Sequence, residues 1–254
     1  MKQPRFQDHF SGIANQYALF RPRYPSSLFE YLASLVSGHD LAWDCATGNG
    51  QAAVALAQSF NQVIATDASA DQIANAESYP RVQYRVATAE KSDLDSGSID
   101  LITVAQALHW FDRPVFYAEA RRVLKPNGIL AAWSYAKMEL DEPQIQILLD
   151  NFYFNTIGPY WPPERKLVEE GYRTLEFPFE EIEPPAFTIE AAMTVEEIMG
   201  YMRTWSATQR YQKELGFDPV LKLEQEMSEI WEDPELPETI HWPLALRVGR
   251  SGNG

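Results

Sequence analysis

Cysteine is almost missing from this chain of 254 residues, because Cys45 is the single example. One thiol cannot form an internal disulfide, which favours a reducing compartment, and there is no cysteine–histidine cluster that would predict a metal site. We expect Cys45 to be a buried packing residue.

Long apolar runs are missing as well. No stretch approaches the roughly 18 apolar residues that a membrane-spanning helix requires, and the polar start of the chain lacks the apolar core of a signal peptide. Together with the single cysteine, these features predict a cytoplasmic protein that holds no metal and no membrane anchor.

Positive charge is scarce. Lysine and arginine number 21 against 36 aspartates and glutamates, so the formal net charge is −15. Such a surface repels nucleic acid and anionic membranes at long range, and nucleic-acid-binding proteins usually carry a basic face. The composition therefore favours a small-molecule partner over nucleic acid or a membrane. It leaves open whether the protein is a monomer or a homodimer.

The most informative motif is the stretch 41–51, an apolar run that reaches Asp44 and then a glycine-rich turn. The pattern predicts a strand, a tight loop and a helix start, where the backbone can approach a ligand closely. A second strand-like run, 62–67, ends in Asp67. An acid in that position can bind both hydroxyls of a ribose, so we predict a nucleoside-containing cofactor.

The glycine loop alone does not identify that cofactor, because residues 48–53 also fit the G-x-G-x-x-A pattern of dinucleotide-binding proteins. Asp44 argues against a dinucleotide, since a carboxylate just before the loop would repel a pyrophosphate. It suits an amino-bearing ligand such as the methionine end of S-adenosylmethionine. An NAD-dependent oxidoreductase stays the less favoured alternative.

Five pieces of the chain resemble a class I S-adenosylmethionine-dependent methyltransferase of the type 11 group, over about residues 10–133. Residues 44–50 look like the family's acid-x-G-x-G-x-G motif, with Ala46 in place of its first glycine. The others are 66–69 at the second strand end, 87–90 after the third strand, 98–105 as the fourth strand, and 121–130 as a helix, turn and fifth strand. His109-Trp110 is similar to a sequence found in the branch that includes trans-aconitate methyltransferase.

The resemblance implies a fold and a set of cofactor-binding positions. The fold is α/β, a Rossmann-like doubly wound sheet of seven mostly parallel strands with a helical lid insertion. The cofactor is S-adenosyl-L-methionine, and the residues implied to bind it are Tyr17, Arg21, Asp44, Ala46, Gly48, Gly50, Asp67, Ala68, Ala89, Glu90, Gln106 and Trp110.

Element boundaries follow from the hydrophobic pattern and the turn residues. We predict strands at 41–46, 62–67, 82–87, 99–105 and 128–134, and helices at 50–59, 69–77 and 113–124. Ser26 is a candidate cap for an earlier helix. Three parts are expected: an N-terminal helical cap over 1–40, the cofactor-binding core over 41–140, and a lid with the last two strands over 141–254.

Methyl transfer is an in-line displacement in which the protein mainly positions the reactants and excludes water. A base is needed only when the acceptor arrives protonated, and His109 is the candidate catalytic base. A histidine that merely lines the site, or a structural one, is the alternative.

The predicted helix over 194–211 carries the candidate substrate residues. Arg203 and Arg210 are seven apart and would share one face of that helix. They could clamp a carboxylate substrate or pair with surface acids. Trp205 would line an apolar pocket or belong to the core.

The favoured interpretation is a methyltransferase that acts on a small acceptor at a carboxylate or at a phenol or alcohol oxygen. A non-catalytic S-adenosylmethionine-binding sensor or scaffold is the alternative from another class. The pattern does not identify the acceptor, because lids of this fold vary freely.

Overall fold

The computed structural model describes residues 22–231 and 233–252. Within them, five parallel strands precede three antiparallel ones in a single sheet. The parallel strands are β1 (Leu41–Cys45), β2 (Gln62–Asp67), β3 (Val82–Val86), β4 (Ile99–Ala105) and β5 (Leu124–Ser134), and the others are β6 (Glu180–Ile182), β7 (Phe187–Met193) and β8 (Glu238–Arg250). The order along the sheet is β3-β2-β1-β4-β5-β8-β6, with β7 also paired to β8.

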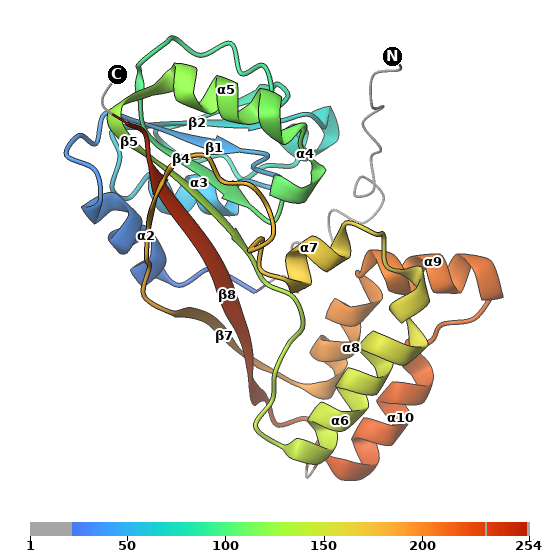
Figure 1. Ribbon diagram of the computed structural model, residues 1–254. Helices are drawn as coiled ribbons and strands as arrows, with labels where there is room; N and C mark the ends of the chain where they lie inside the picture. Colours follow the sequence, from blue (N-terminus) through green and yellow to red (C-terminus); the bar gives the residue numbers. More distant parts are fainter. Residues whose placement is uncertain (1–21, 232, 253–254) are drawn as a thin grey trace.

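Helices cover both faces of the parallel strands, which is why β1 and β4 are almost continuously apolar. The helix α5 (Arg113–Val123) lies on one face, whereas α2 (Ser26–Ser34) and α3 (Gln51–Leu56) lie on the other (Figure 1). Trp43 and Phe116 belong to the buried core on the α5 side. The short α4 (Ala70–Ala74) follows β2.

The prediction of a serine cap at Ser26 is wrong. Pro25 occupies the N-cap position of α2, and no side chain caps that helix end. The proline ring holds φ of Pro25 at −66°, and the Pro25 carbonyl accepts the N–H of Leu28 at 3.1 Å.

A second body of helices forms the lid, beside the sheet (Figure 1). Its helices are α6 (Pro143–Asn151), α8 (Val195–Arg203), α9 (Ser206–Leu215) and α10 (Val220–Ile230), while α7 (Arg165–Glu169) lies between the lid and the sheet. A π-helix (Phe152–Thr156) and the 3₁₀-helix η3 (Gly158–Tyr160) join α6 to α7. A separate apolar core fills the lid. No helix in the described part of the chain is long and apolar enough to cross a membrane.

The single helix expected over 194–211 is two helices. The expected capping box at its start is present, because Thr194 and Glu197 bond each other's backbone amides. The helix ends at Arg203, however, and Trp205 takes an extended conformation before α9 begins. Arg203 and Arg210 therefore lie on different helices.

The long strand β8 links the sheet to the lid. Its first half pairs with β7 from Leu244 back to Glu238, and its second half pairs with β5 and β6 up to Arg250. In Figure 1, β7 and β8 run together from the sheet down to the lid helices. β6 and β7 both pair with β8. The proline pair 184–185 lies between them, and proline cannot donate a hydrogen bond to a strand ladder. The predicted Rossmann-like α/β fold is confirmed.

Candidate functional site

The loop between β1 and α3 has a backbone that few residue types adopt. Ala46, Gly48 and Gly50 all have positive φ angles, of 56°, 57° and 90°. Ala46 thus takes a left-handed conformation at the position where the resembling motif has a glycine. The three positive φ angles bend the backbone of the loop around the end of β1.

The two glycines of this loop have different surroundings. A Cβ on Gly50 would stand 2.2 Å from the hydroxyl oxygen of Tyr84, so only glycine fits there. Among the described residues, a Cβ on Gly48 would meet the Gln72 side-chain oxygen, at 3.9 Å, and nothing nearer, so these residues leave one face of the loop open. An open loop face with a closely approachable backbone fits a nucleoside-bearing cofactor.

Asp67 ends β2 and ties that strand end to the glycine loop. Its carboxylate accepts hydrogen bonds from the backbone N–H groups of Gly48 and Ser69, both at 2.9 Å. A carboxylate is an acceptor-only group of the type that recognises ribose hydroxyls. Asp67 and the following Ala68 are half-buried, at the edge where a ribose would be recognised.

Asp44 is farther inside than the motif suggests. Its carboxylate is fully buried and accepts hydrogen bonds from the hydroxyls of Thr47 and Thr103. Burial raises the pKa of Asp44 to about 6, against the lowering effect of these bonds. Direct contact with a ligand's amino group is therefore not available in this arrangement, in which Asp44 fixes the loop from beneath.

The remaining predicted cofactor residues lie along the same edge of the sheet. Ala89 is buried, and the Glu90 carboxylate accepts the backbone N–H of Asp112 at 3.0 Å. Gln106 has a φ of 57° directly after β4, and its side-chain amide donates to the carbonyl of Tyr135 at 2.8 Å. Trp110 is 40% exposed. Tyr17 and Arg21 lie outside the described residues.

His109 lies in a 3₁₀ turn (Leu108–Trp110) that follows β4. Its Nδ1 is 2.8 Å from the hydroxyl oxygen of Tyr172, and its ring packs against Trp110 at 4.6 Å between centroids. Burial, with added repulsion from Arg165 and Arg113, lowers the pKa of His109 to about 3. The ring is therefore neutral at neutral pH.

Arg165, the first residue of α7, is a site residue that the sequence did not predict. Its guanidinium lies over the Trp161 ring at 4.5 Å and donates to the Tyr153 hydroxyl and to the carbonyl of Ala136, both at 2.7 Å. It thereby joins the lid to the end of β5 while its charge acts on His109. No motif signalled it, because its partners are distant in sequence.

The predicted arginine clamp is not formed. The guanidinium of Arg203 donates to Asp218 and Glu224, both at 2.8 Å, so it is occupied by carboxylates of the lid itself. Arg210 donates instead to the carbonyl of Tyr160 at 3.4 Å. The broken helix separates the two arginines, and Arg210 lines a cavity.

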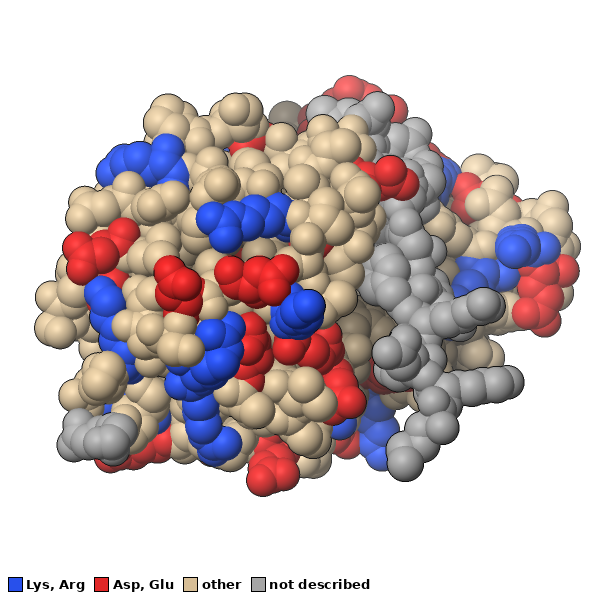
Figure 2. Space-filling view, turned by 90° about the horizontal axis from the view of Figure 1, so that it is seen from above, with Lys and Arg blue, Asp and Glu red and all other residues tan. Residues whose placement is uncertain are grey.

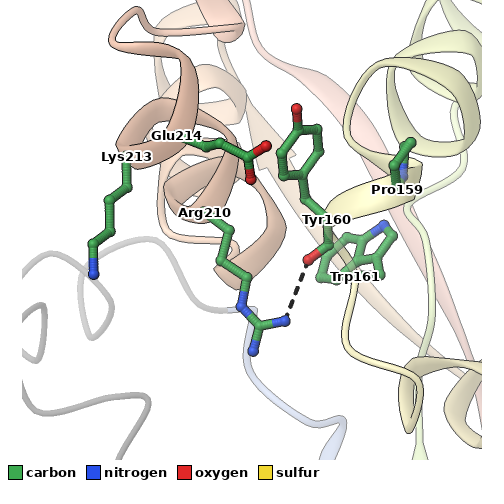
Figure 3. Close-up of a pocket in the computed structure, with 6 residues that line it drawn as sticks. All are labelled: Pro159, Tyr160, Trp161, Arg210, Lys213 and Glu214. Carbon is green, nitrogen blue, oxygen red and sulfur yellow. Dashed lines mark hydrogen bonds between the residues drawn. The ribbon is translucent and has the colours of Figure 1, made fainter.

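That cavity has a volume of about 470 Å³, within the range of small-molecule sites. Figure 3 shows that η3 and α9 line it, with Glu214 beside the Tyr160 ring and Arg210 reaching the Tyr160 carbonyl. A second cavity of about 150 Å³ shares Arg210 and Lys213. The lining residues are Pro159, Tyr160, Trp161, Arg210, Lys213 and Glu214.

Trp205 belongs to an aromatic cluster behind this cavity. Its ring centroid lies 5.8 Å from that of Trp161, 5.9 Å from that of Tyr153 and 5.5 Å from that of Tyr201. Pairs at such distances stabilise by about 0.5–1.5 kcal/mol beyond the area they bury. Trp205 is accordingly a packing residue of the lid, in contact with the wall of the cavity.

Charge is distributed without a basic face on the side seen in Figure 2, where Lys and Arg side chains lie among Asp and Glu side chains. The described residues also contain no group of histidine, cysteine and acidic side chains that could hold a metal ion.

Comparisons with known proteins agree on one family. The model of a methyltransferase domain matches residues 43–132, from β1 to β5. The "Putative methyltransferase" of Dictyostelium discoideum is 42% identical over 209 residues, covering 80% of this chain and 78% of that protein. The methyltransferase AacuQ of Aspergillus aculeatus is 29% identical over 150 residues, which span 56% of this chain and 48% of that protein.

A solved structure extends the similarity to the lid. The "Putative Type II Methyltransferase" of Anaeromyxobacter dehalogenans is 41% identical, with a TM-score of 0.88. The match covers 92% of this chain and 100% of the solved chain. The helical lid and the β7–β8 ribbon are thus within the shared architecture.

Proposed function

This chain belongs to the class I S-adenosylmethionine-dependent methyltransferases, and from that premise we propose that it methylates an oxygen of a small anionic acceptor. The family assignment removes the NAD-dependent oxidoreductase that the glycine loop alone left open. More specifically, the acceptor carries a carboxylate, of the kind that the trans-aconitate branch uses.

We propose that the cofactor binds along the edge of the sheet described above. When bound, S-adenosylmethionine supplies a methyl group activated by a sulfonium. Asp67 would accept the ribose hydroxyls, the open face of Gly48 would let the backbone approach, and Ala89 and Glu90 would border the base. Gln106 would border the methionine end, while Asp44 holds the loop in shape through Thr47.

The acceptor's place is supported by one observation, the cavity of the lid that Arg210 and Lys213 share with an aromatic wall. Within the described chain, no carboxylate pairs with either cation, whereas Arg203 nearby has two. An anionic group between Arg210 and Lys213 would be stabilised by both. Glu214, beside the Tyr160 ring, would favour a neutral or hydrogen-bond-donating group at the other end.

Two side chains relate the wall of the cavity to His109, which supports this place for the acceptor. Trp161 forms part of the wall and stacks on Arg165, and the charge of Arg165 acts on His109 after β4. An acceptor held by one anionic group in the lid would thus extend its reacting oxygen toward the carboxyl ends of the strands, where ligands of this sheet type bind.

The test is a methyl-transfer assay with labelled S-adenosylmethionine and a panel of small carboxylic acids and phenols, each paired with its uncharged amide or methyl ether. We expect transfer to the acids and a KM at least about tenfold higher for Arg210→Gln, a loss of ~1.4 kcal/mol. Lys222→Gln, on an exposed ion pair of α10, is the matched control. Tight cofactor binding with no transfer to any acceptor would favour the sensor alternative.

A further inference from the structure

The bond between His109 and Tyr172 can be made in two ways, with opposite chemical results. If Nδ1–H donates to the tyrosine oxygen, the other ring nitrogen, Nε2, carries a lone pair and can act as a base. If the tyrosine O–H donates to Nδ1, the ring hydrogen is on Nε2, which then is a donor. The 2.8 Å distance fits both arrangements.

The surroundings of Tyr172 distinguish the two. The side chain is fully buried, and burial raises the pKa of its phenol well above 10, so the phenol keeps its proton. Among the described residues, the one hydrogen-bond partner of its hydroxyl oxygen is Nδ1 of His109.

The buried tyrosine hydrogen therefore has one acceptor within reach, the lone pair of Nδ1. If Nδ1–H donated to the phenol oxygen instead, that hydrogen would be left without an acceptor. The opposite arrangement satisfies every group, because the tyrosine O–H then donates to Nδ1. Leaving the buried hydroxyl hydrogen unpaired would cost about 1–3 kcal/mol, which decides between the two.

Nε2 of His109 is on the other side of the ring from Nδ1. The structure gives it no hydrogen-bond partner among the described residues, and His109 is half-buried, so this nitrogen can meet a ligand. The ring is also fixed in place between Trp110 and Tyr172, at 4.6 and 5.9 Å between centroids.

We propose that Tyr172 is a positioning residue that fixes His109 in its Nε2–H form, so that His109 meets the methyl acceptor as a hydrogen-bond donor and not as a general base. The proposal rests on the proposed function for the identity of the ligand. It narrows the acceptor to an oxygen that is already an anion when it binds, such as a carboxylate. A donor at Nε2 orients such an oxygen, whereas an aliphatic alcohol would need a base that His109 does not supply.

The tautomer can be measured directly by long-range proton–nitrogen NMR correlation on the full chain labelled with ¹⁵N-histidine. The chain has four histidines, and the His109→Asn variant assigns the relevant signals. At pH 7 we expect a protonated-type nitrogen at Nε2 and an unprotonated-type nitrogen at Nδ1. A protonated Nδ1 in the wild-type protein would overturn the proposal without any further variant.

Tyr172→Phe tests the cause, because it removes only the hydroxyl. We expect the His109 signals to move toward a mixture of the two tautomers, while Tyr153→Phe, which alters a hydroxyl bonded to Arg165 and Glu169, leaves them in place. Unchanged His109 signals in a folded Tyr172→Phe variant would remove the positioning role. Should that variant not fold, the wild-type spectrum still decides the tautomer.

The effect of Tyr172 on the choice of acceptor is measured separately from the methyl-transfer assay that tests the proposed function. With Tyr172→Phe we expect kcat for a carboxylate acceptor to fall at least about fivefold while the dissociation constant of S-adenosylhomocysteine stays within about twofold. An aliphatic alcohol that the wild type methylates as fast as a carboxylate would contradict the proposal. Absence of transfer to every acceptor, with the Nε2–H form observed, would count against the proposed function alone.

Discussion

At the scale of single residues, the glycine loop is where the backbone is most constrained. Gly50→Ala would combine a φ of 90° with a Cβ only 2.2 Å from the Tyr84 hydroxyl oxygen. We expect it to lower the free energy of unfolding by ~1–2 kcal/mol more than Gly97→Ala does. Gly97 is the matched control, since it has a φ of 64° and no atom of the described residues lies within 4 Å of its Cβ position. Equal losses in urea unfolding of both variants would show that contact with Tyr84 has no effect.

A second prediction for a single residue concerns Asp44 and the pH dependence of the free energy of unfolding. Its pKa is raised from 3.8 to about 6, so the folded state holds the proton more tightly than the unfolded chain. The contribution of this group is fully present below pH 3.8 and is lost as the pH rises through about 6. Relative to Asp44→Asn, the wild type should therefore lose stability between pH 4 and 7, by ~3 kcal/mol at most.

The measurement for Asp44 is urea unfolding of both proteins at a series of pH values. Because every other titrating group is shared, their contributions cancel in the difference between the two curves. Parallel curves from pH 4 to 7 would mean that the carboxylate ionises normally in the folded protein. The hydrogen bonds to Thr47 and Thr103 would then outweigh its burial.

At the scale of elements, the broken lid helix gives its two arginines different tasks. Arg203 ends α8 and binds Asp218, just before α10, and Glu224 within α10. Arg203→Gln should therefore lower stability by ~1–2 kcal/mol and leave the acceptor KM unchanged. Arg210→Gln should do the reverse, with stability within ~0.5 kcal/mol and a raised acceptor KM. Urea unfolding and steady-state kinetics of both variants check this. A common effect on both quantities would contradict the separation.

The sequence predicted the elements whose signals are local. The central strands β1 and β4 are buried along most of their length and stand out as mainly apolar runs, and the capping box between Thr194 and Glu197 needs only four residues. The break at Trp205 has no local signal, because neither glycine nor proline is near it. That residue leaves the helix because its ring packs among aromatics from α8 and the segment before α7, a tertiary contact that outweighs helix propensity.

In the candidate site, too, residues with a local sequence signal were predictable and residues brought together only by the fold were not. Asp67 and the loop glycines were predictable because a turn of this kind restricts the residue types within a few positions. The pairing of His109 with Tyr172 was not predictable, since 63 residues separate them and only the fold brings them together. Arg165 was missed for the same reason, as its partners include the carbonyl of Ala136, 29 residues earlier.

At the scale of the whole molecule, β8 connects the two bodies of the structure. Its residues from Glu238 to Leu244 pair with β7 in a two-stranded ribbon that reaches the lid. Its residues from Ala245 to Arg250 pair with β5 and complete the sheet. The lid core also contains Trp242, which is fully buried next to Tyr201. Neither body can unfold without disturbing a strand that the other requires.

We therefore expect the sheet and the lid to unfold in one cooperative transition, with equal calorimetric and van't Hoff enthalpies. S-adenosylhomocysteine at about 100 times its dissociation constant should add ~2.7 kcal/mol and raise the single midpoint by about 5–11 °C. Scanning calorimetry with and without the ligand measures both. If two transitions appeared and the ligand moved only one of them, the lid would be an independent folding unit, and the continuous pairing of β8 would not couple the acceptor cavity to the cofactor-binding sheet.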